Sequence, residues 1–215
     1  MRARKKKWAP DVLENNPRIL RDLATYEGES LNKVFQNGNP VHVEIGCGKG
    51  RFIIETSRQN PDINYVAIER EAVILATAAR RAEEMEAGSL VFALQDVDNL
   101  ADYFAPGDIT RLYINFCDPW PGKKKWAKRR LTHDNYLAKY EALKIPEIFF
   151  KTDNRILFEA SLESFSRMKW TLQNVSLDLH SNITIDNVMT EYEEKFSPHG
   201  PIYRLEALLP TRHVD

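Results

Sequence analysis

Short apolar runs alternate with amphipathic segments over the middle of the chain. Five runs have the length and residue types of buried strands: Val41–Ile45, Tyr65–Glu69, Leu90–Gln95, Arg111–Phe116 and Ile148–Lys151. Residues 51–59 and 71–86 have helical spacing of apolar positions, and a further helix is predicted over 133–144 with Thr132 as its N-cap. Buried strands that alternate with helices predict a parallel sheet with helices on both faces.

The last third of the chain has a different pattern. Trp170–Leu179 and Ile202–Leu209 are predicted to be strands that pair antiparallel, separated by an acidic helical stretch from Asp186 to Phe196. The predicted fold class is therefore α/β, with a Rossmann-like, seven-stranded, mostly parallel sheet that ends in a C-terminal antiparallel hairpin. We expect one domain over residues 39–215, preceded by a basic N-terminal arm and helical lead-in over residues 1–38.

Composition narrows the class of protein. The chain has 215 residues, of which 43% are apolar, which is typical of a globular domain. No apolar stretch reaches the roughly 18 residues of a membrane span, and no apolar segment of a signal peptide follows the basic N-terminus. We expect a cytoplasmic protein without membrane contact. Its two cysteines and five histidines lack metal-ligand spacing, so no metal is expected.

Positive charge is concentrated in two blocks, although the net charge of the chain is only −1. Residues 2–7 contain five basic side chains, and residues 123–130 contain six. Dense local positive charge on a nearly neutral protein indicates attraction to a polyanion such as a nucleic acid.

A glycine-rich turn and three acidic strand ends predict a cofactor site. Glu44 lies at the end of the first strand, and Gly46, Gly48 and Gly50 follow it in the spacing ExGxGxG, which differs from the GxGxxG of dinucleotide sites. A carboxylate there would repel a pyrophosphate but attract a cationic amino-acid group. Two further carboxylates end the next strands: Glu69, placed for ribose hydroxyls, and Asp96, placed for an adenine amino group. Together these positions fit S-adenosylmethionine.

The most specific segment is Asn115-Phe116-Cys117-Asp118-Pro119-Trp120-Pro121, which lies between the fourth strand and the second basic block. Pro119 and Pro121 restrict the backbone and so fix the directions of Asp118 and Trp120. An aromatic ring beside a carboxylate can stack on a nucleobase and accept hydrogen bonds from its N–H groups.

Five short motifs occur in order along the chain: Arg2-x-Arg4; Glu44-x-Gly46-x-Gly48-x-Gly50; Asp118-Pro119-Trp120-Pro121 with Lys128-Arg129-Arg130-Leu131; Phe150-Lys151-Thr152-Asp153-Asn154; and Thr190-Glu191-Tyr192-Glu193-Glu194-Lys195-Phe196. In this combination the chain resembles the bacterial tRNA (guanine-N(7)-)-methyltransferase family over essentially its whole length. The resemblance implies transfer of a methyl group from S-adenosylmethionine to N(7) of a guanine in tRNA, at position 46 of the variable loop.

The resemblance also implies roles for individual residues. The cofactor site would comprise Glu44, Gly46, Gly48, Glu69, Asp96 and Asp118, and Asp118 would also be the catalytic residue. The substrate site would comprise Lys123, which follows an inserted Gly122, and Asp153, Thr190, Glu191, Tyr192 and Glu193. The RNA-contacting segment would comprise Lys125, Trp126, Lys128, Arg129 and Arg130.

Other functions remain open at this point. Guanine N(7) carries a lone pair and no proton, so its methylation needs positioning and electrostatic support rather than a general base. A cytosine-5 RNA methyltransferase would instead use the thiolate of Cys117 as a nucleophile. A small-molecule methyltransferase would leave both basic blocks unexplained, and a non-catalytic RNA-binding protein would not need all four acidic positions. Whether the protein is a monomer or a homodimer is left open.

Overall fold

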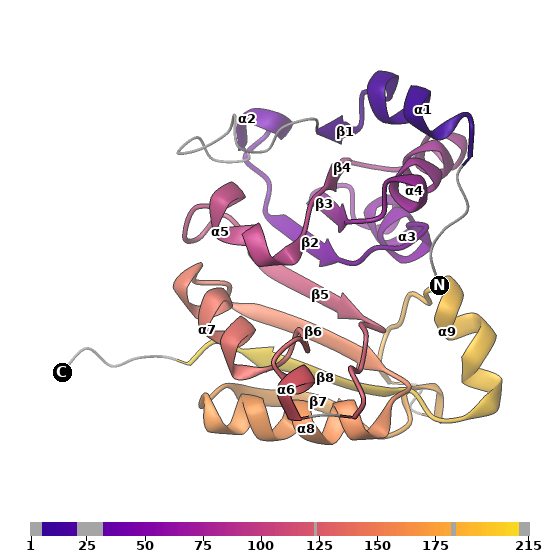
Figure 1. The fold of residues 1–215 in the computed structure, drawn as a ribbon. Coiled ribbons are helices and arrows are strands. Elements are labelled where there is room, and N and C mark those ends of the chain that lie inside the picture. The colour runs from indigo at the N-terminus through magenta and orange to yellow at the C-terminus, as the bar shows by residue number, and fades with distance from the viewer. Residues whose placement is uncertain (1–5, 21–31, 123, 182–183, 211–215) are drawn as a thin grey trace.

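An eight-stranded sheet forms the middle of the protein (Figure 1). The computed structural model describes residues 6–20, 32–122, 124–181 and 184–210. In spatial order the strands are β1 (Ile19–Leu20), β4 (Leu90–Leu94), β3 (Asn64–Glu69), β2 (Val41–Ile45), β5 (Arg111–Asn115), β6 (Glu147–Thr152), β8 (Tyr203–Leu208) and β7 (Thr171–Ser176).

Helices and short 3-10 turns connect these strands. The helices are α1 (Ala9–Asn15), α2 (Asn32–Phe35), α3 (Arg51–Gln59), α4 (Ala72–Glu84), α5 (Leu100–Tyr103), α6 (Lys124–Ala127), α7 (Asp134–Ala142), α8 (Arg155–Arg167) and α9 (Glu191–Phe196). The 3-10 turns are η2 (Val97–Asn99), η3 (Leu179–Ser181) and η4 (Ser197–His199).

The pairing of the strands confirms the predicted fold class. Neighbouring strands from β1 to β6 pair parallel, whereas β8 pairs antiparallel with both β6 and β7. The seven predicted strands correspond to β2–β8. The additional strand β1 places Ile19 opposite Phe92 of β4, and its two residues are too few to give a recognisable pattern in the sequence.

The order of the strands reverses at β2, which has β3 on one side and β5 on the other. In open parallel sheets the connections diverge at such a point and leave a crevice at the carboxyl ends of the strands, where ligands bind. The fold therefore directs attention to the ends of β2, β3, β4 and β5.

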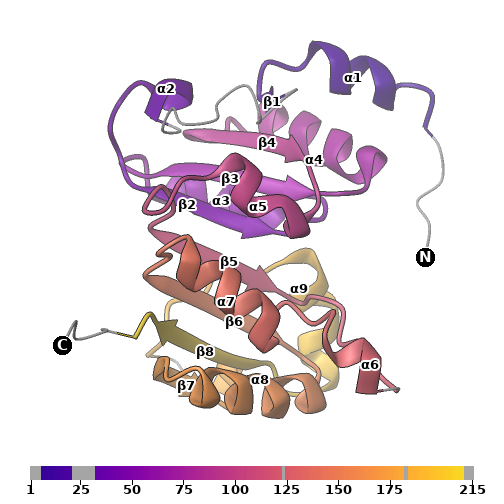
Figure 2. The same ribbon diagram turned by 60° about the vertical axis from the view of Figure 1, so that its left-hand side comes forward.

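Helices cover both faces of the sheet: α5, α7 and α8 lie on one face, and α3, α4 and α9 lie on the other (Figure 2). Each face has its own apolar cluster. Phe158 of α8 stacks on Phe150 of β6 on the first face, whereas the ring of Phe52 of α3 contacts that of Tyr113 of β5 on the second.

Alternation along the strands directs polar side chains to the second face. Ile45, Ile114 and Phe150 belong to the first apolar cluster. Because successive side chains of a strand point to opposite faces, the adjacent Glu44, Asn115 and Lys151 lie on the face covered by α3 and α9. Register places Asn115 directly opposite Lys151 in the β5–β6 pair.

Two details of the predicted helices are wrong. His133, not Thr132, is the N-cap of α7: its Nδ1 accepts a hydrogen bond from the Asn135 amide at 3.2 Å. Thr132 is buried, and its hydroxyl lies 2.6 Å from that of Ser161. The acidic helix begins only at Glu191. Residues 186–190 have no regular secondary structure, and Lys151 of β6 donates to the Val188 carbonyl oxygen at 3.0 Å, so this oxygen is bound to the sheet rather than within a helix.

Within the part of the chain that the structure describes, no helix is both long and apolar enough to cross a bilayer. The same residues contain no group of three or more His, Cys, Asp or Glu side chains arranged to hold a metal ion.

Candidate active site

The chain turns sharply between β2 and α3 on three glycines, and we call residues 46–50 the glycine turn. Gly46, Gly48 and Gly50 have φ angles of +72°, +58° and +81°, which L side chains rarely adopt. A Cβ atom at Gly50 would also lie 3.0 Å from Cβ of Ala78, so glycine here allows α3 to approach α4. The turn follows the carboxyl end of β2 directly, where the sequence placed it.

A cavity of about 520 Å³ opens at the carboxyl ends of β3, β4 and β5. Its lining brings together Gly46, Glu69, Asp96, Asp118, Trp120 and Arg129. The carboxylate of Glu69 accepts the amide of Gly48 at 3.1 Å and that of Glu71 at 3.0 Å, which ties it to the glycine turn. Asp96 caps η2 by accepting the Asp98 amide at 3.0 Å. Three of the predicted acidic residues thus line one cavity.

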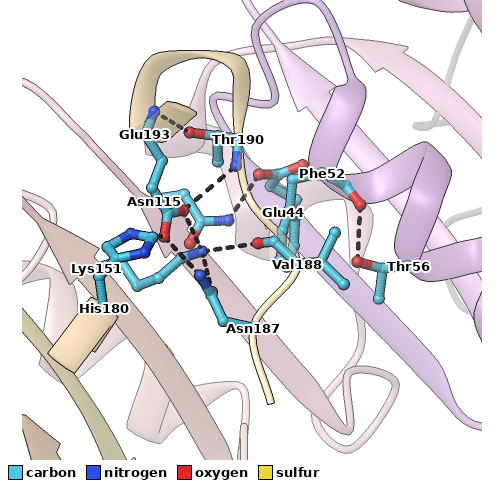
Figure 3. Close-up of polar contacts among 10 residues, drawn as sticks. All are labelled: Glu44, Phe52, Thr56, Asn115, Lys151, His180, Asn187, Val188, Thr190 and Glu193. Carbon is cyan, nitrogen blue, oxygen red and sulfur yellow. Dashed lines mark hydrogen bonds and ion pairs between the residues drawn. The ribbon is translucent and has the colours of Figure 1, made fainter. Parts of the chain in front are cut away.

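Glu44 lines a smaller cavity of about 190 Å³ that shares Gly46, Asn115 and Phe116 with the larger one. The Glu44 side chain is buried, and its Oε1 accepts a hydrogen bond from Asn115 Nδ2 at 2.8 Å (Figure 3). Its Oε2 is equally inaccessible and has no hydrogen-bond partner among the described residues. A buried carboxylate oxygen without a donor is costly, so this position is suited to a ligand that supplies one.

Burial determines the protonation of Glu44. Desolvation raises the pKa of this carboxyl to about 7, against the hydrogen bond from Asn115 and the positive charge of Lys151, which lower it. The Glu69 carboxylate adds to the increase. The group therefore ionises near neutral pH, where a bound cation would favour its charged form.

Residues from the start of α9 close the smaller cavity opposite the glycine turn. Thr190, Glu191 and Tyr192, which we call the α9 wall, all line it. Thr190 caps α9 in a capping box with Glu193. The hydroxyl of Tyr192 donates to Asp153 Oδ2 at 2.9 Å, so a predicted substrate residue at the end of β6 lies beside this wall.

Glu193 has a different environment from the rest of its predicted turn. It is 0% exposed, and its carboxylate binds Lys151 Nζ at 2.7 Å, Asn187 Nδ2 at 2.6 Å and His180 Nε2 at 3.1 Å (Figure 3). It lines neither of the two cavities described above. The structure thus places Glu193 behind the α9 wall, in contact with the protein itself.

A rigid corner follows β5 over residues 116–121. Phe116 and Trp120 have φ angles of +52° and +44°. Arg130 Nε donates to the Pro119 carbonyl oxygen at 2.9 Å, and the guanidinium carbon of Arg129 lies 4.9 Å from the Trp120 ring centroid. These contacts fix the corner that carries Asp118, which is exposed at the edge of the larger cavity.

The predicted RNA-contacting residues follow this corner. Lys125 and Trp126 lie in α6, with Trp126 exposed, and Lys128 and Arg129 are exposed beyond it. Arg130 is half-buried against the corner. Lys123 lies outside the described residues, as do the basic side chains of residues 1–5.

Asn115 and Lys151 are site residues to which the sequence assigned no role. Asn115 holds Glu44, and Lys151 is buried with its ammonium bound to the segment that leads into α9. Both occur within motifs noted in the sequence. The available signal was their alternation with Ile114 and Phe150, which places them on the same face as Glu44.

The environment of Cys117 does not suit a nucleophile. Burial raises the pKa of its thiol to about 12, and the neighbouring Asp118 carboxylate also raises it. A thiolate is therefore scarce at neutral pH, and the thiolate is the reactive species.

The chain is similar in sequence to known methyltransferases. A family model described as a putative methyltransferase matches residues 38–205. The chain is 50% identical to the tRNA (guanine-N(7)-)-methyltransferase of Bacillus subtilis (strain 168) over 210 residues, which cover 96% of this chain and 98% of that protein. It is 45% identical to the enzyme of the same name from Clostridioides difficile (strain 630), with the same coverage of 96% and 98%.

Solved structures with the same fold are more distant in sequence. The 16S rRNA methyltransferase KamB has a TM-score of 0.60 at 13% identity, covering 84% of this chain and 93% of that one. A 16S rRNA (adenine(1408)-N(1))-methyltransferase from Catenulisporales acidiphilia, solved with cosubstrate SAM, also has a TM-score of 0.60, at 14% identity over 90% and 94% of the two chains. These similarities concern the fold.

Glu44→Gln should stabilise the protein increasingly as pH rises. Because the folded-state pKa of about 7 exceeds the unfolded value of 4.5, stability present at low pH is lost as the carboxyl ionises. The Gln variant lacks this loss, so its free energy of unfolding should gain about 3 kcal/mol on wild type between pH 4.5 and pH 8. Urea unfolding of both proteins across this range measures the difference, and a difference independent of pH would contradict it.

Proposed function

The chain belongs to the tRNA (guanine-N(7)-)-methyltransferase family, and we propose that it transfers a methyl group from S-adenosylmethionine to N(7) of a guanine in tRNA. The alternative of a cytosine-5 methyltransferase has no support from these relatives or from the buried thiol of Cys117. A non-catalytic RNA-binding role has none from relatives that are named as enzymes.

The unpartnered oxygen of Glu44 is the observation that carries the proposal. Around it, two buried carboxyl groups, Glu44 and Glu193, face one buried ammonium, that of Lys151. With the neighbouring imidazole of His180 neutral, the cluster therefore lacks one positive charge when Glu44 is ionised. The amino-acid part of S-adenosylmethionine carries an ammonium that can supply both the charge and the missing donor.

The remaining cofactor contacts follow from the larger cavity. Gly46 and Gly48 leave the backbone open beside Glu44, since a Cβ atom at either would meet no atom within 4 Å. Glu69 ends β3, where its carboxylate can accept the ribose hydroxyls, and Asp96 ends β4, where it can accept the adenine amino group. These residues and Asp118 form the cofactor site that we propose.

The rigid corner and the α9 wall are suited to a guanine. When bound, the cofactor supplies an electrophilic methyl group on a positively charged sulfur. Asp118 accepts hydrogen bonds from the amino edge of the guanine and balances the positive charge that develops on the ring, while Trp120 offers a stacking face. Since N(7) has no proton to lose, these residues act by positioning and charge stabilisation, and no side chain serves as a general base.

Further contacts to the substrate are proposed for Lys123, Asp153, Thr190, Glu191 and Tyr192. Asp153 and Tyr192 are hydrogen-bonded to each other, so a substrate group that binds one also meets the other. Glu193, which the family pattern includes in this turn, acts in our proposal by holding the α9 wall, because its carboxylate already binds three side chains.

Beyond the base site, Lys125, Trp126, Lys128, Arg129 and Arg130 form the proposed RNA-contacting surface. The cations attract the phosphates, and the exposed ring of Trp126 can stack on an unpaired base. The methyltransferase domain is proposed to comprise residues 39–215, with residues 1–38 as a lead-in that adds the edge strand β1 to its sheet; the family model matches residues 38–205. We also propose a cytoplasmic location, which the proposed tRNA substrate supports.

Asp118→Ala should lower kcat by about 10²–10³-fold while S-adenosylmethionine still binds, because the base loses its charge partner and the other cofactor contacts remain. The assay incubates unmodified tRNA with labelled cofactor and analyses the nucleosides for 7-methylguanosine. Asp62→Ala, an exposed aspartate between α3 and β3, is the control and should keep wild-type activity. Full turnover by Asp118→Ala would remove this residue from the mechanism.

Replacing Lys128, Arg129 and Arg130 with alanine should reduce the salt dependence of tRNA binding. Each phosphate contact contributes about one unit to the slope of log K against log salt, so the slope should fall by about 2 to 3. Filter binding between about 50 and 200 mM salt measures it. Alanine at Arg58, Lys144 and Lys169, exposed cations after or at the distant ends of α3, α7 and α8, should leave the slope unchanged. An unchanged slope in the first variant would exclude this segment from the RNA surface.

A further inference from the structure

We propose that Lys151 is a positioning residue that holds the α9 wall against the cofactor site and supports the charge of Glu44. It lines a separate cavity of about 790 Å³ but neither of the two cavities of the cofactor site, so it acts on that site through its neighbours. The inference rests on the proposed function only for the identity of the cofactor.

The ammonium of Lys151 uses its three N–H groups on one short segment of chain (Figure 3). It donates to Asn187 Oδ1 at 2.9 Å, to the Val188 carbonyl oxygen at 3.0 Å and to Glu193 Oε2 at 2.7 Å. Lys151 itself lies in β6, in the middle of the sheet. A single side chain thus joins the rigid sheet to the segment that carries the α9 wall.

Glu193 transmits this attachment to the α9 wall. Its Oε2 accepts from both Lys151 Nζ and, at 3.3 Å, the Thr190 amide, and its own amide donates to the Thr190 hydroxyl at 2.9 Å. The Glu193 carboxylate, which is bound to Lys151, therefore fixes the orientation of Thr190. Movement of the ammonium would displace the first turn of α9 and the cavity wall with it.

Tyr192 of the α9 wall also contacts Asp153 and the ring of Phe116, whereas the ion pairs of the wall with the cofactor site are exposed. Glu191 pairs with Arg81 at 2.6 Å and with Lys49 at 3.9 Å, and the three side chains are between 30% and 59% exposed. Ion pairs with this exposure contribute little to stability because water screens them. The side chains of Lys151 and Glu193 are only 6% and 0% exposed, so water screens this ion pair much less than the pairs of Glu191.

Lys151 also affects Glu44 through its charge. Asn115 separates the two: it lies opposite Lys151 in register and donates to Glu44 Oε1 at 2.8 Å. The ammonium lowers the pKa of Glu44, which burial raises to about 7. Loss of the ammonium would raise this pKa further and leave less of the carboxylate charged at neutral pH.

The other titratable groups around this pair come from each element packed against it. They are Glu69 of β3, Cys47 of the glycine turn, Tyr113 and Arg111 of β5, Arg51 and Glu55 of α3, Glu193 of α9, Asp186 before α9, His180 of η3 and Arg204 of β8. Among the described residues, Lys151 is the cation whose charge lowers the pKa of Glu44. Arg204 acts on Lys151, whose pKa burial lowers.

The test compares Lys151→Met with Arg204→Met. Met retains the length of lysine without its charge, and Arg204 forms a second buried ion pair, with Glu206, on the same face of the sheet. Arg204 has no contact with the α9 wall or with Glu44 among the described interactions. Both changes remove the cation of a buried ion pair, so both should lower stability. Only the first should alter the site.

Two measurements separate the roles. Hydrogen exchange of amides 187–193 should be about ten-fold faster or more in Lys151→Met than in Arg204→Met, relative to the exchange of each protein's core strands. The pH at which affinity for S-adenosylmethionine is half-maximal should rise by about one unit in Lys151→Met, which weakens binding near pH 7 up to ten-fold. Arg204→Met should retain the wild-type midpoint.

The inference would be overturned if amides 187–193 exchanged equally fast in Lys151→Met and Arg204→Met and the pH midpoint of S-adenosylmethionine binding in Lys151→Met stayed at the wild-type value. If that variant fails to fold, the double variant K151M/E193M, which leaves no unpaired charge, serves instead. It should show the same faster exchange and weaker cofactor binding, and wild-type values would overturn the inference equally. Failure of the wild-type protein to bind S-adenosylmethionine would contradict the proposed function, whereas the exchange measurement would still test the attachment by Lys151.

Discussion

A line of buried polar side chains across three parallel strands determines the architecture of the site. Glu44, Asn115 and Lys151 lie at the carboxyl ends of β2, β5 and β6, on the face that α3 and α9 cover. Because side chains alternate along each strand, the three side chains lie on the same face of the sheet, and because the strands are parallel, they lie at the same edge of it. Charges in such a position must be paired, and one oxygen of Glu44 is not. The site is built to receive a cation.

Segments far apart in the sequence meet around this line. The glycine turn follows β2 directly in the sequence. The α9 wall lies much nearer the C-terminus, and the segment before it is bound to the sheet by the hydrogen bonds of Asn187 and Val188 with Lys151. The rigid corner extends from β5 and is held by Arg130. Cofactor, base and RNA surfaces are thus arranged in order along one edge of the sheet. The order follows from strand topology rather than from any single motif.

Local patterns predicted the fold well but placed the buried contacts poorly. The strands, the glycine turn and the acidic strand ends follow from residue types and spacing. By contrast, the irregular segment before α9 is bound to Lys151 in β6, and the environment of Glu193 includes contacts with residues distant in sequence. The local pattern of Asp186–Phe196 is therefore helical throughout although the helix begins only at Glu191, and the motif that contains Glu193 carries no sign of its burial. Similarly, Thr132 has the residue type of an N-cap, yet Ser161 of α8 takes its hydroxyl into the core.

The number of protons released when S-adenosylmethionine binds tests most directly whether Glu44 forms the cation site. Calorimetry near pH 6.5 in buffers of different ionisation enthalpy gives this number. Glu44, with a pKa of about 7 before binding, is mostly protonated there and should ionise against the ligand's ammonium. The wild-type protein should release between about half and one proton, and Glu44→Gln should release none. Equal release by the two proteins would contradict the account.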